Sequence, residues 1–437
     1  MRQFTSGEMA DLVQGKIYGI PEIVINHVLI DSRKYSGNKG TCFFALRGGN
    51  NDGHNYIDEL IDRGVQTFVV EDEPKRVIPS HLCFILVDNT LHALQSFAAE
   101  VRKEFEGSVT AITGSNGKTI VKEWIFQMMD PIYKIFRSPR SYNSQVGVPL
   151  SVFLMDEETD YVILEAGISK PGEMQRLERI VRPETVIFTN IGDAHQENFN
   201  SKEEKIEEKL KLASNALNII YCKDHETLDS KIQFILPGIQ KLTWGKTQYA
   251  DYQYSIQNDS SGTKLKLKGK IEGEFCLPFN DHASIENILH VIVFLIEKNI
   301  SIEQIKAGLH SIEPVEMRMQ LLKGINNCTI INDSYNSDLN SLENSLDLLA
   351  RQNQHEELTV ILSDILQSNS SPVKLYQDVA EFIHRNNPDR FIGIGTEISK
   401  FSHLFPNRSV FYSTTRDFLD DFEKFHFRNE AILLKGS

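Results

Sequence analysis

The chain has 437 residues, of which 41% are hydrophobic and 24% are charged, and its formal net charge is −14. A chain of this length is too long for a single hydrophobic core, which predicts two to four domains. The acidic balance argues against a general nucleic-acid binder, because such a protein would carry a basic face.

The N-terminus and the cysteines bear on the compartment in which the protein works. The first residues lack the apolar core of a secretory signal, and no run of about 18 apolar residues appears. The five cysteines are scattered and include no C-x-x-C pair, which fits reduced and mostly buried thiols better than a disulfide framework or a zinc site. We therefore expect a cytoplasmic protein.

Three stretches of the chain differ in their pattern. Up to residue 86, short β-like runs are broken by Gly and Asn, at 24–30, 42–46, 67–70 and 83–87. From 87 to 313, nearly continuous apolar runs alternate with helical segments such as 201–217, and the runs fall at 109–113, 161–166, 185–190 and 218–222. Such runs are typical of strands that are buried on both faces of a parallel sheet.

The last stretch, from 314 to 437, repeats this rhythm with strand-like runs at 328–332, 358–363, 390–395, 409–412 and 431–435. Strands that alternate with helices predict βαβ units and a second open sheet. Alternation of polar and apolar residues at 262–275 predicts a β-hairpin in the middle stretch. The expected fold class is α/β with three domains, at 1–86, 87–313 and 314–437.

The run GSNGKT lies between an expected strand and a helix that contains 121–129. Backbone N–H groups of such a turn, together with a helix N-terminus, form a concave site for phosphate oxygens. The lysine of such a loop reaches the terminal phosphates, and the hydroxyl of the next residue can bind Mg²⁺. Ile112 stands where the full pattern has its first Gly, so the loop is a shortened variant, and a plain Gly-rich turn is the alternative. The expected nucleotide-binding residues are Gly114, Ser115, Asn116, Gly117, Lys118 and Thr119.

Two further side chains follow neighbouring strands. Glu165 ends the run 161–166, and His195 follows the run 185–190. Ligands of an open α/β sheet collect at the carboxyl ends of its strands, so both should lie near the phosphate loop as Mg²⁺ ligands. The alternatives are a capping glutamate and a histidine that orders a loop. Lys209, on a charged helical segment, has no role by this reasoning.

Polar clusters outside the central stretch are weaker signals. Ser32 with Arg33, and Arg47 with Gly48, combine strand ends with the groups that an anion or sugar-phosphate site uses, although Gly- and Asn-rich turns are common. The irregular segment 138–149, which contains Asn143 and Ser144, is either a substrate loop or a connection.

Together these residues resemble the Mur ligase superfamily, the ATP-dependent amide-bond-forming enzymes that build the peptide of bacterial cell-wall precursors. The resemblance runs through all three stretches, in IDSRK (30–34), FFALRGGNNDGHNYI (43–57), ITGSNGKT (112–119), SYNSQVGVPLS (141–151), LEAGISKPGEM (164–174), TNIGDAHQENFNS (189–201) and INDSYNSDLNS (331–341). Ser144, Asn332, Ser337 and Leu339 depart from the superfamily's segments. The last segment favours the branch that adds D-alanyl-D-alanine to UDP-N-acetylmuramoyl-tripeptide.

The resemblance implies a mechanism and an architecture. ATP would phosphorylate the terminal carboxylate of the tripeptide, and the amine of D-alanyl-D-alanine would attack the acyl phosphate. Mg²⁺ and Lys118 would neutralise the charge that develops. The three domains would be a small uridine-nucleotide domain, a central P-loop ATPase domain and a Rossmann-like domain that closes over ATP, and the protein would be a monomer.

The resemblance also assigns roles to single residues. Thr119 and Glu165 would hold one Mg²⁺, and His195 a second, supported by Lys209 after carbamylation by CO₂. Asn287 would face the adenine and Arg318 would reach ATP from the third domain, whereas the spacing of His282 does not match. Substrate would be bound by Ser32, Arg33, Arg47, Gly48, Asn143 and Ser144, and in the third domain by Asp333, Tyr335 and Asn336.

The end of the chain and the rival functions complete these expectations. The chain stops at LLKGS (433–437), where relatives continue, so we expect a truncated third domain or the front of a ligase fused to an alanine racemase. The alternatives are a folylpolyglutamate synthase, a ligase adding the third peptide residue, an inactive nucleotide-binding scaffold, and a P-loop GTPase or motor. The third residue of the tripeptide, meso-diaminopimelate or lysine, is left open.

Overall fold

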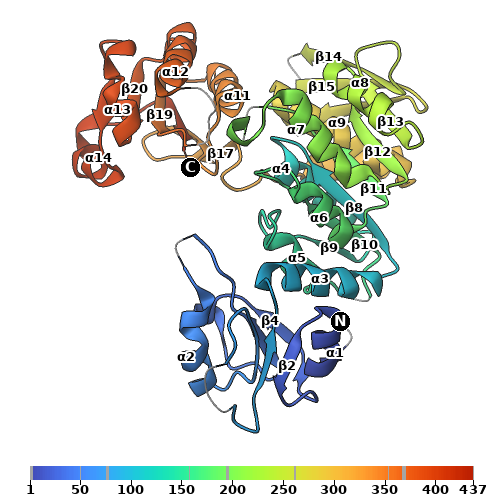
Figure 1. The fold of residues 1–437 in the computed structure, drawn as a ribbon. Helices are drawn as coiled ribbons and strands as arrows, with labels where there is room; N and C mark the ends of the chain where they lie inside the picture. Colours follow the sequence, from blue (N-terminus) through green and yellow to red (C-terminus); the bar gives the residue numbers. More distant parts are fainter. Residues whose placement is uncertain are drawn as a thin grey trace.

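The computed structural model describes residues 3–49, 51–74, 78–156, 158–192, 196–259, 262–352, 354–366 and 371–436. Three large sheets follow one another along the described chain, with the N-terminal part at the bottom of Figure 1 and the C-terminal part at the upper left. The predicted α/β fold class with parallel sheets is confirmed. These sheets support our proposal that the chain divides into domains at 1–86, 87–313 and 314–437.

The first sheet has five strands in the order β2-β7-β6-β5-β4. The strands are β2 (Lys16–Gly19), β7 (Cys83–Leu86), β6 (Thr67–Val70), β5 (Thr41–Phe44) and β4 (His27–Leu29). Only β2 of these runs antiparallel to its neighbour. Two helices belong to the same part of the chain: α1 (Ser6–Leu12) precedes β2, and α2 (Ile57–Asp62) lies between β5 and β6.

The predicted strand at 24–30 is wrong as a single element. Val24–Ile25 forms β3 and pairs with β1 (Phe4–Thr5), whereas β4 pairs with β5. Between them, the backbone N–H of Asn26 donates to the carbonyl of Gly40 at 2.8 Å. This bond turns the chain from a two-stranded ribbon into the main sheet.

The second sheet has nine strands in the order β16-β15-β14-β13-β12-β11-β8-β10-β9. Seven neighbouring strands are parallel, namely β14 (Tyr252–Asp259), β13 (Gln240–Gly245), β12 (Asn218–Cys222), β11 (Thr185–Phe188), β8 (Ser108–Thr113), β10 (Tyr161–Glu165) and β9 (Ile135–Arg137). The predicted hairpin is confirmed as antiparallel β15 (Gly262–Gly269) and β16 (Gly273–Leu277), which extend one edge of this sheet.

Helices cover both faces of the second sheet. One apolar core joins it to the first sheet through α3 (Thr90–Lys103), α5 (Gly147–Val152) and α6 (Glu173–Val181). The opposite face packs against α4 (Lys118–Met129), α9 (His282–Glu297) and α10 (Ile302–Ser311). Buried Val and Ile side chains on both faces explain why the strands read as continuous apolar runs.

The helix in the segment 201–217 is shorter than predicted. Helix α7 spans Lys202–Leu210, and a 3₁₀ turn follows at Lys211–Ala213. Helix α8 spans Glu226–Ile235 after β12.

The described chain contains no helix that is long and apolar enough to cross a membrane. All five cysteines are unpaired and four are buried, as predicted.

The third sheet has the order β17-β18-β22-β19-β20-β21, and only its edge strand β17 is antiparallel. The strands are β17 (Gln320–Lys323), β18 (Thr329–Asp333), β22 (Glu430–Lys435), β19 (Glu357–Ser363), β20 (Arg390–Ile394) and β21 (Val410–Tyr412). Helices α11 (Leu339–Ala350), α12 (Pro372–Asn386), α13 (Thr396–Lys400) and α14 (Thr415–Asp421) connect them. The predicted second open sheet is therefore confirmed.

Candidate active site

The GSNGKT loop joins β8, in the middle of the second sheet, to the N-terminus of α4. Gly117 precedes the helix with φ +83°, and no side chain caps the helix there. The first N–H groups of a helix have no partner within the helix, and its dipole favours negative charge at this end. The loop therefore presents backbone donors where phosphate oxygens would lie.

Close approaches explain two glycines of this loop. A Cβ on Gly117 would lie 2.1 Å from Oδ1 of Asn287, and one on Gly114 would lie 2.0 Å from Oγ1 of Thr189. Both glycines also have positive φ. A side chain at either position would therefore collide with a neighbour and adopt an unfavourable backbone conformation.

Glu165 lies beside the loop because β10 is the parallel neighbour of β8. Its side chain is fully buried, and its Oε2 accepts hydrogen bonds from the Thr119 hydroxyl at 3.1 Å and from Asn143 Nδ2 at 3.3 Å. Its Oε1 makes no hydrogen bond of good geometry, although Lys122 Nζ lies 2.9 Å away. The structure therefore brings together the predicted metal-binding pair, Thr119 and Glu165.

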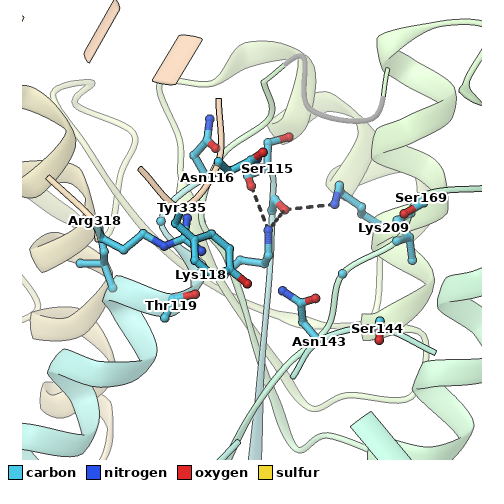
Figure 2. A pocket seen from close by; sticks show the side chains of 16 residues that line it. Ser115, Asn116, Lys118, Thr119, Asn143, Ser144, Ser169, Lys209, Arg318 and Tyr335 are labelled. Carbon is cyan, nitrogen blue, oxygen red and sulfur yellow. Dashed lines mark hydrogen bonds between the residues drawn. The ribbon is translucent and has the colours of Figure 1, made fainter. Parts of the chain in front are cut away.

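Lys118 and Lys209 both donate to the carbonyl of Gly114, and Figure 2 shows how the two side chains converge. Lys118 Nζ donates to the carbonyls of Gly114 and Ser115 at 2.9 and 2.8 Å, and Lys209 Nζ donates to Gly114 at 3.0 Å. Burial lowers the pKa of Lys118 to about 8. Burial, followed by the charges of Lys118 and Lys205, holds the pKa of Lys209 well below its usual range.

A cavity of about 370 Å³ opens over the loop. Its walls come from loops and helices around the second and third sheets: Lys209 and Ser169 lie on one side, and Arg318 and Tyr335 on the other (Figure 2). Asn336 also lines the cavity. The Arg318 guanidinium lies 3.8 Å from the centre of the Tyr335 ring, and burial lowers its pKa. The cavity therefore concentrates cationic side chains within an acidic chain, which suits a polyphosphate.

Four further predicted residues lie around this cavity. Asn143 and Ser144 line it, and the Ser144 hydroxyl accepts the N–H of Gly147 at 3.1 Å at the start of α5. Asn287 and Asp333 line a smaller adjoining cavity, which shares Arg318 with the first. Asp333 Oδ2 accepts hydrogen bonds from Lys435 at 2.6 Å and from Ser345 at 2.6 Å, so its carboxylate is engaged within the third domain.

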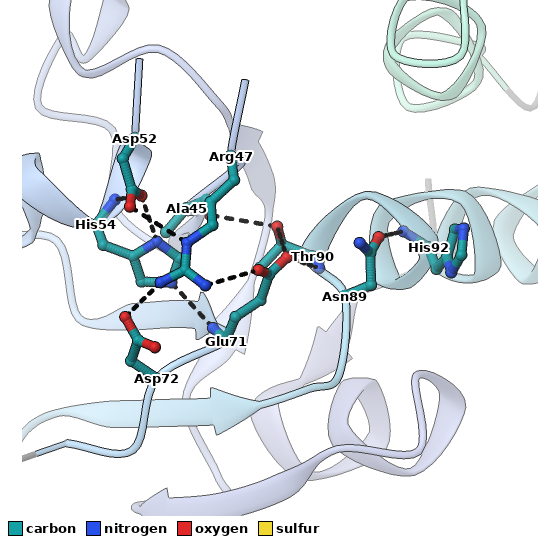
Figure 3. Close-up of polar contacts among 9 residues, drawn as sticks. All are labelled: Ala45, Arg47, Asp52, His54, Glu71, Asp72, Asn89, Thr90 and His92. Atoms are coloured by element: carbon teal, nitrogen blue, oxygen red, sulfur yellow. Dashed lines mark hydrogen bonds and ion pairs between the residues drawn. The ribbon is translucent and has the colours of Figure 1, made fainter. Parts of the chain in front are cut away.

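The other predicted substrate residues lie in the first sheet's part of the chain and line neither cavity. Arg47 contacts three carboxylates, at 3.2 Å from Asp52, 3.2 Å from Glu71 and 2.5 Å from Asp72 (Figure 3). Gly48 follows Arg47, and its N–H donates to the carbonyl of Asn51. Arg33 is exposed and paired with Asp31, whereas the neighbouring Ser32 is buried.

One predicted residue and one missed residue remain. His195, the predicted second metal ligand, lies outside the described residues. Lys122 was not predicted: it is fully buried in α4, contacts Glu165, and donates to the carbonyls of Ser138 and Arg140. The signal was present in the sequence, since a lysine stands among apolar residues in the helix after the loop.

The arrangement defines a P-loop enzyme that acts on a nucleoside triphosphate. Two protein-family profiles match the chain: "Mur ligase family, catalytic domain" at residues 24–102 and "Mur ligase middle domain" at 112–295. The chain belongs to the Mur ligase family, and it is an ATP-dependent amide-bond-forming ligase.

Curated relatives extend over almost the whole chain. The UDP-N-acetylmuramoyl-tripeptide–D-alanyl-D-alanine ligase of Bacillus subtilis (strain 168) is 28% identical over 445 residues, covering 99% of this chain and 95% of that protein. The ligase of the same name from Escherichia coli (strain K12) is 25% identical over 407 residues, covering 91% and 87%.

Solved structures share the fold. MurF from Acinetobacter baumannii superposes with a TM-score of 0.87 at 22% identity, over 100% of this chain and 96% of that chain. MurF ligase from Thermotoga maritima in complex with ADP gives a TM-score of 0.79 at 20% identity, over 94% of each chain.

Proposed function

We propose that this chain joins D-alanyl-D-alanine to UDP-N-acetylmuramoyl-tripeptide and forms the UDP-N-acetylmuramoyl-pentapeptide of peptidoglycan synthesis, with release of ADP and phosphate. The observation that carries the proposal is the cavity over the GSNGKT loop, which Lys118 and Arg318 line and beside which Glu165 is buried. It lies in a chain whose full-length relatives bear the name of this ligase.

The first chemical step is phosphorylation of the tripeptide carboxylate. The loop amides and Lys118 would hold the transferring phosphate and stabilise the charge of the transition state. The acyl phosphate and ADP are the products of this step. Arg318 and Tyr335, on the opposite wall, would keep the nucleotide in place and keep water from the acyl phosphate.

The second step is attack by the amine of D-alanyl-D-alanine on the acyl carbon. The new C–N bond forms as the C–O bond to phosphate breaks, and the amine loses its proton. Asn143 and Ser144 lie on the cavity wall beside Gly167 and would contact the reacting ends of the two substrates. Asn336 lines the cavity from the third domain and would do the same from there.

The residues around Glu165 fit a Mg²⁺ ion. Glu165 Oε1 is buried and lies 2.9 Å from Lys122 Nζ in an ion pair, and the Thr119 hydroxyl lies 3.1 Å from the other carboxylate oxygen. Both are hard oxygen donors of the kind that Mg²⁺ prefers. When bound, the ion would withdraw charge from the transferring phosphate.

Lys209 is proposed to be carbamylated and, in that form, to support a second metal ion. The surroundings of its amine support this proposal. Burial lowers the pKa of the Lys209 amine, which raises the share of the neutral form that attacks CO₂. As the N–C bond forms, one C=O bond of CO₂ becomes a C–O⁻ bond and one proton leaves the nitrogen, so a neutral amine becomes an anionic carbamate. His195 remains a proposed partner of that position.

Binding of the uridine nucleotide by Ser32, Arg33, Arg47 and Gly48 also remains a proposal. Arg47 would have to exchange one or more carboxylate partners for the diphosphate. Asn287 beside Gly117 is proposed to face the nucleotide. The monomeric state, the cytoplasmic location and the racemase fusion stay predictions.

The test is phosphate release from ATP with Mg²⁺, bicarbonate and UDP-N-acetylmuramoyl-tripeptide, in the presence and absence of D-alanyl-D-alanine. We expect phosphate only with both substrates, with either meso-diaminopimelate or lysine as third residue. The variant Lys118→Ala should be inactive, whereas Lys134→Ala, at an exposed ion pair, should match wild type. Turnover that does not depend on the dipeptide with either tripeptide would refute the proposal.

A further inference from the structure

A second group of metal-ligating side chains lies away from the GSNGKT loop. Among the described residues, Cys222, His225 and Glu286 place a sulfur, an imidazole nitrogen and a carboxylate oxygen all within 4.8 Å of one another. Cys222 ends β12, His225 directly precedes α8, and Glu286 lies on α9. Three separate elements of the second sheet's layer therefore contribute one ligand atom each.

The Cys222–His225 pair has the C-x-x-H spacing at which one turn of backbone directs two side chains to a common point. Cys222 is only 2% exposed, so its sulfur is shielded from solvent on the inner side of the group.

The imidazole of His225 has a nitrogen available. Its Nε2 lies 3.5 Å from Glu286 Oε1, whereas its Nδ1 is buried and has no hydrogen-bond partner. A buried polar atom without a partner costs free energy, which a ligand would recover. His282 Nδ1 lies 4.0 Å from the same Glu286 oxygen, on the exposed side of the group. This leaves a fourth position for His282 or for water.

We propose that Cys222, His225 and Glu286 bind a Zn²⁺ ion. Sulfur, nitrogen and oxygen donors in one small cluster suit this borderline-soft ion and do not suit Mg²⁺, which prefers oxygen ligands only. Metal–ligand bonds of about 2.0–2.3 Å place the ligand atoms of a tetrahedral site roughly 3.3–3.8 Å apart. Ligand atoms that now lie up to 4.8 Å apart would move closer by about 1 Å through rotation of the three side chains. On binding, the thiol proton leaves to solvent.

The position of the site gives it a consequence for the nucleotide site. Glu286 immediately precedes Asn287, which packs against Gly117 of the loop. Glu286 also lines the smaller cavity beside that loop. The ion would tie the start of α8 to α9 and hold Asn287 in place. The site is distinct from the proposed Mg²⁺ site, and its occupancy does not depend on which substrates the ligase uses.

The test is titration of the full chain with Co²⁺, a spectroscopic substitute for Zn²⁺, followed by displacement with Zn²⁺. A sulfur-to-cobalt charge-transfer band reports only a site with a cysteine ligand, so oxygen ligands at the GSNGKT loop do not contribute. We expect the band in wild type and in Cys276→Ser, which removes the exposed cysteine. We expect its loss in Cys222→Ser and a weakening of Co²⁺ affinity by more than about tenfold in His225→Asn.

Folding of each variant is checked by circular dichroism, and His225→Asn, at a half-buried position, provides a second variant if Cys222→Ser does not fold. No band in wild type would overturn the proposal. A band that persists in Cys222→Ser, or that disappears in Cys276→Ser, would also overturn it.

Discussion

Lys122 Nζ lies 2.9 Å from Glu165 Oε1, and both side chains are completely buried. The lysine therefore neutralises the Glu165 carboxylate beside the GSNGKT loop. Removing one partner of a buried ion pair leaves an uncompensated charge, which costs far more than removing both.

We expect Lys122→Met to lower the free energy of unfolding by about 3–5 kcal/mol. The double variant Lys122→Met/Glu165→Leu should recover most of this loss, because neither charge remains. The measurement is urea unfolding followed by tryptophan fluorescence, since both tryptophans, Trp124 and Trp244, lie in the second sheet's layer. Additive losses in the double variant would contradict this view of the pair.

A side chain at Gly117 would be strained, because the backbone there is left-handed and Asn287 lies too close. We expect Gly117→Ala to weaken ADP binding by more than about tenfold, because the left-handed backbone costs about 1–2 kcal/mol and the new methyl group would collide with Asn287. Isothermal titration calorimetry with ADP provides the measurement. Gly49→Ala is the matched control, since a Cβ there meets open space and φ is not positive. Equal affinities in the two variants would count against the loop geometry.

Carbamylation of Lys209 can be observed directly. We expect a carbamate carbon signal in ¹³C NMR after addition of labelled bicarbonate, and its loss in Lys209→Arg. The same variant should lower kcat/KM by more than about 100-fold. Lys211→Arg changes an adjacent lysine that pairs with Glu208, and it should retain both signal and activity. A signal that survives Lys209→Arg would move the modification to another lysine.

Arg318 is the third domain's cation in the cavity. We expect Arg318→Ala to reduce kcat/KM for ATP by roughly 100-fold, because a half-buried cation on the cavity wall, proposed to face the phosphates, would be lost. Arg351→Ala removes an exposed arginine of the same domain that pairs with Asp347, and should have little effect. Steady-state kinetics in ATP compare the two. Wild-type kinetics in Arg318→Ala would show that the third domain does not supply this contact.

We expect the buried His290 side chain to make the free energy of unfolding depend on pH. Burial lowers its pKa from 6.5 to about 4, and its ring accepts a hydrogen bond from Trp244 at 3.1 Å. Glu286 acts on this pKa in the raising direction and His225 in the lowering direction. As pH falls from about 6.5 to about 4, the unfolded chain takes up a proton that the folded chain does not, so stability is lost in this window by up to about 3 kcal/mol.

The measurement is urea unfolding of wild type and His290→Gln on both sides of this window. The difference in unfolding free energy between them should grow at the higher pH, since only wild type contains the titrating ring. His310→Gln, a residue in the last turn of α10 outside this core, is the control. Parallel pH profiles for wild type and His290→Gln would remove His290 as the cause.

Much of the fold followed from local pattern. The strands at 109–113 and 161–166 were predicted correctly because both of their faces are buried, so most of their residues are apolar. The break at Asn26 could not be read, because it depends on a hydrogen bond to Gly40. The length of α7 was overestimated because the charged pattern continues into the 3₁₀ turn.

The residues of the candidate site that belong to one sequence motif were predicted. Residues that only the packing of separate elements brings together were missed. The loop residues 114–119 carry their own signature, and Glu165 was placed by the rule that ligands gather at strand ends. Lys122 was missed because a lysine in a helix is usually solvated. Its apolar neighbours along the helix hint at burial, but its contacts with Ser138 and Glu165 depend on the packing of α4. Cys222, His225 and Glu286 converge through the sheet order, which spacing along the chain does not reveal.

Lys118, Lys205 and Arg318 converge at the ligand-free site, and their positive charges repel one another. Lys205 is buried and the other two are half-buried, and after the effect of burial the charges of Arg318 and Lys205 lower the pKa of Lys118. A multivalent anion neutralises these positive charges as it binds. Part of its binding free energy therefore comes from relief of the electrostatic repulsion between them. The ligand-free enzyme in dilute buffer is then its least stable form, and simple anions such as pyrophosphate or sulfate should raise its melting temperature before any substrate is recognised.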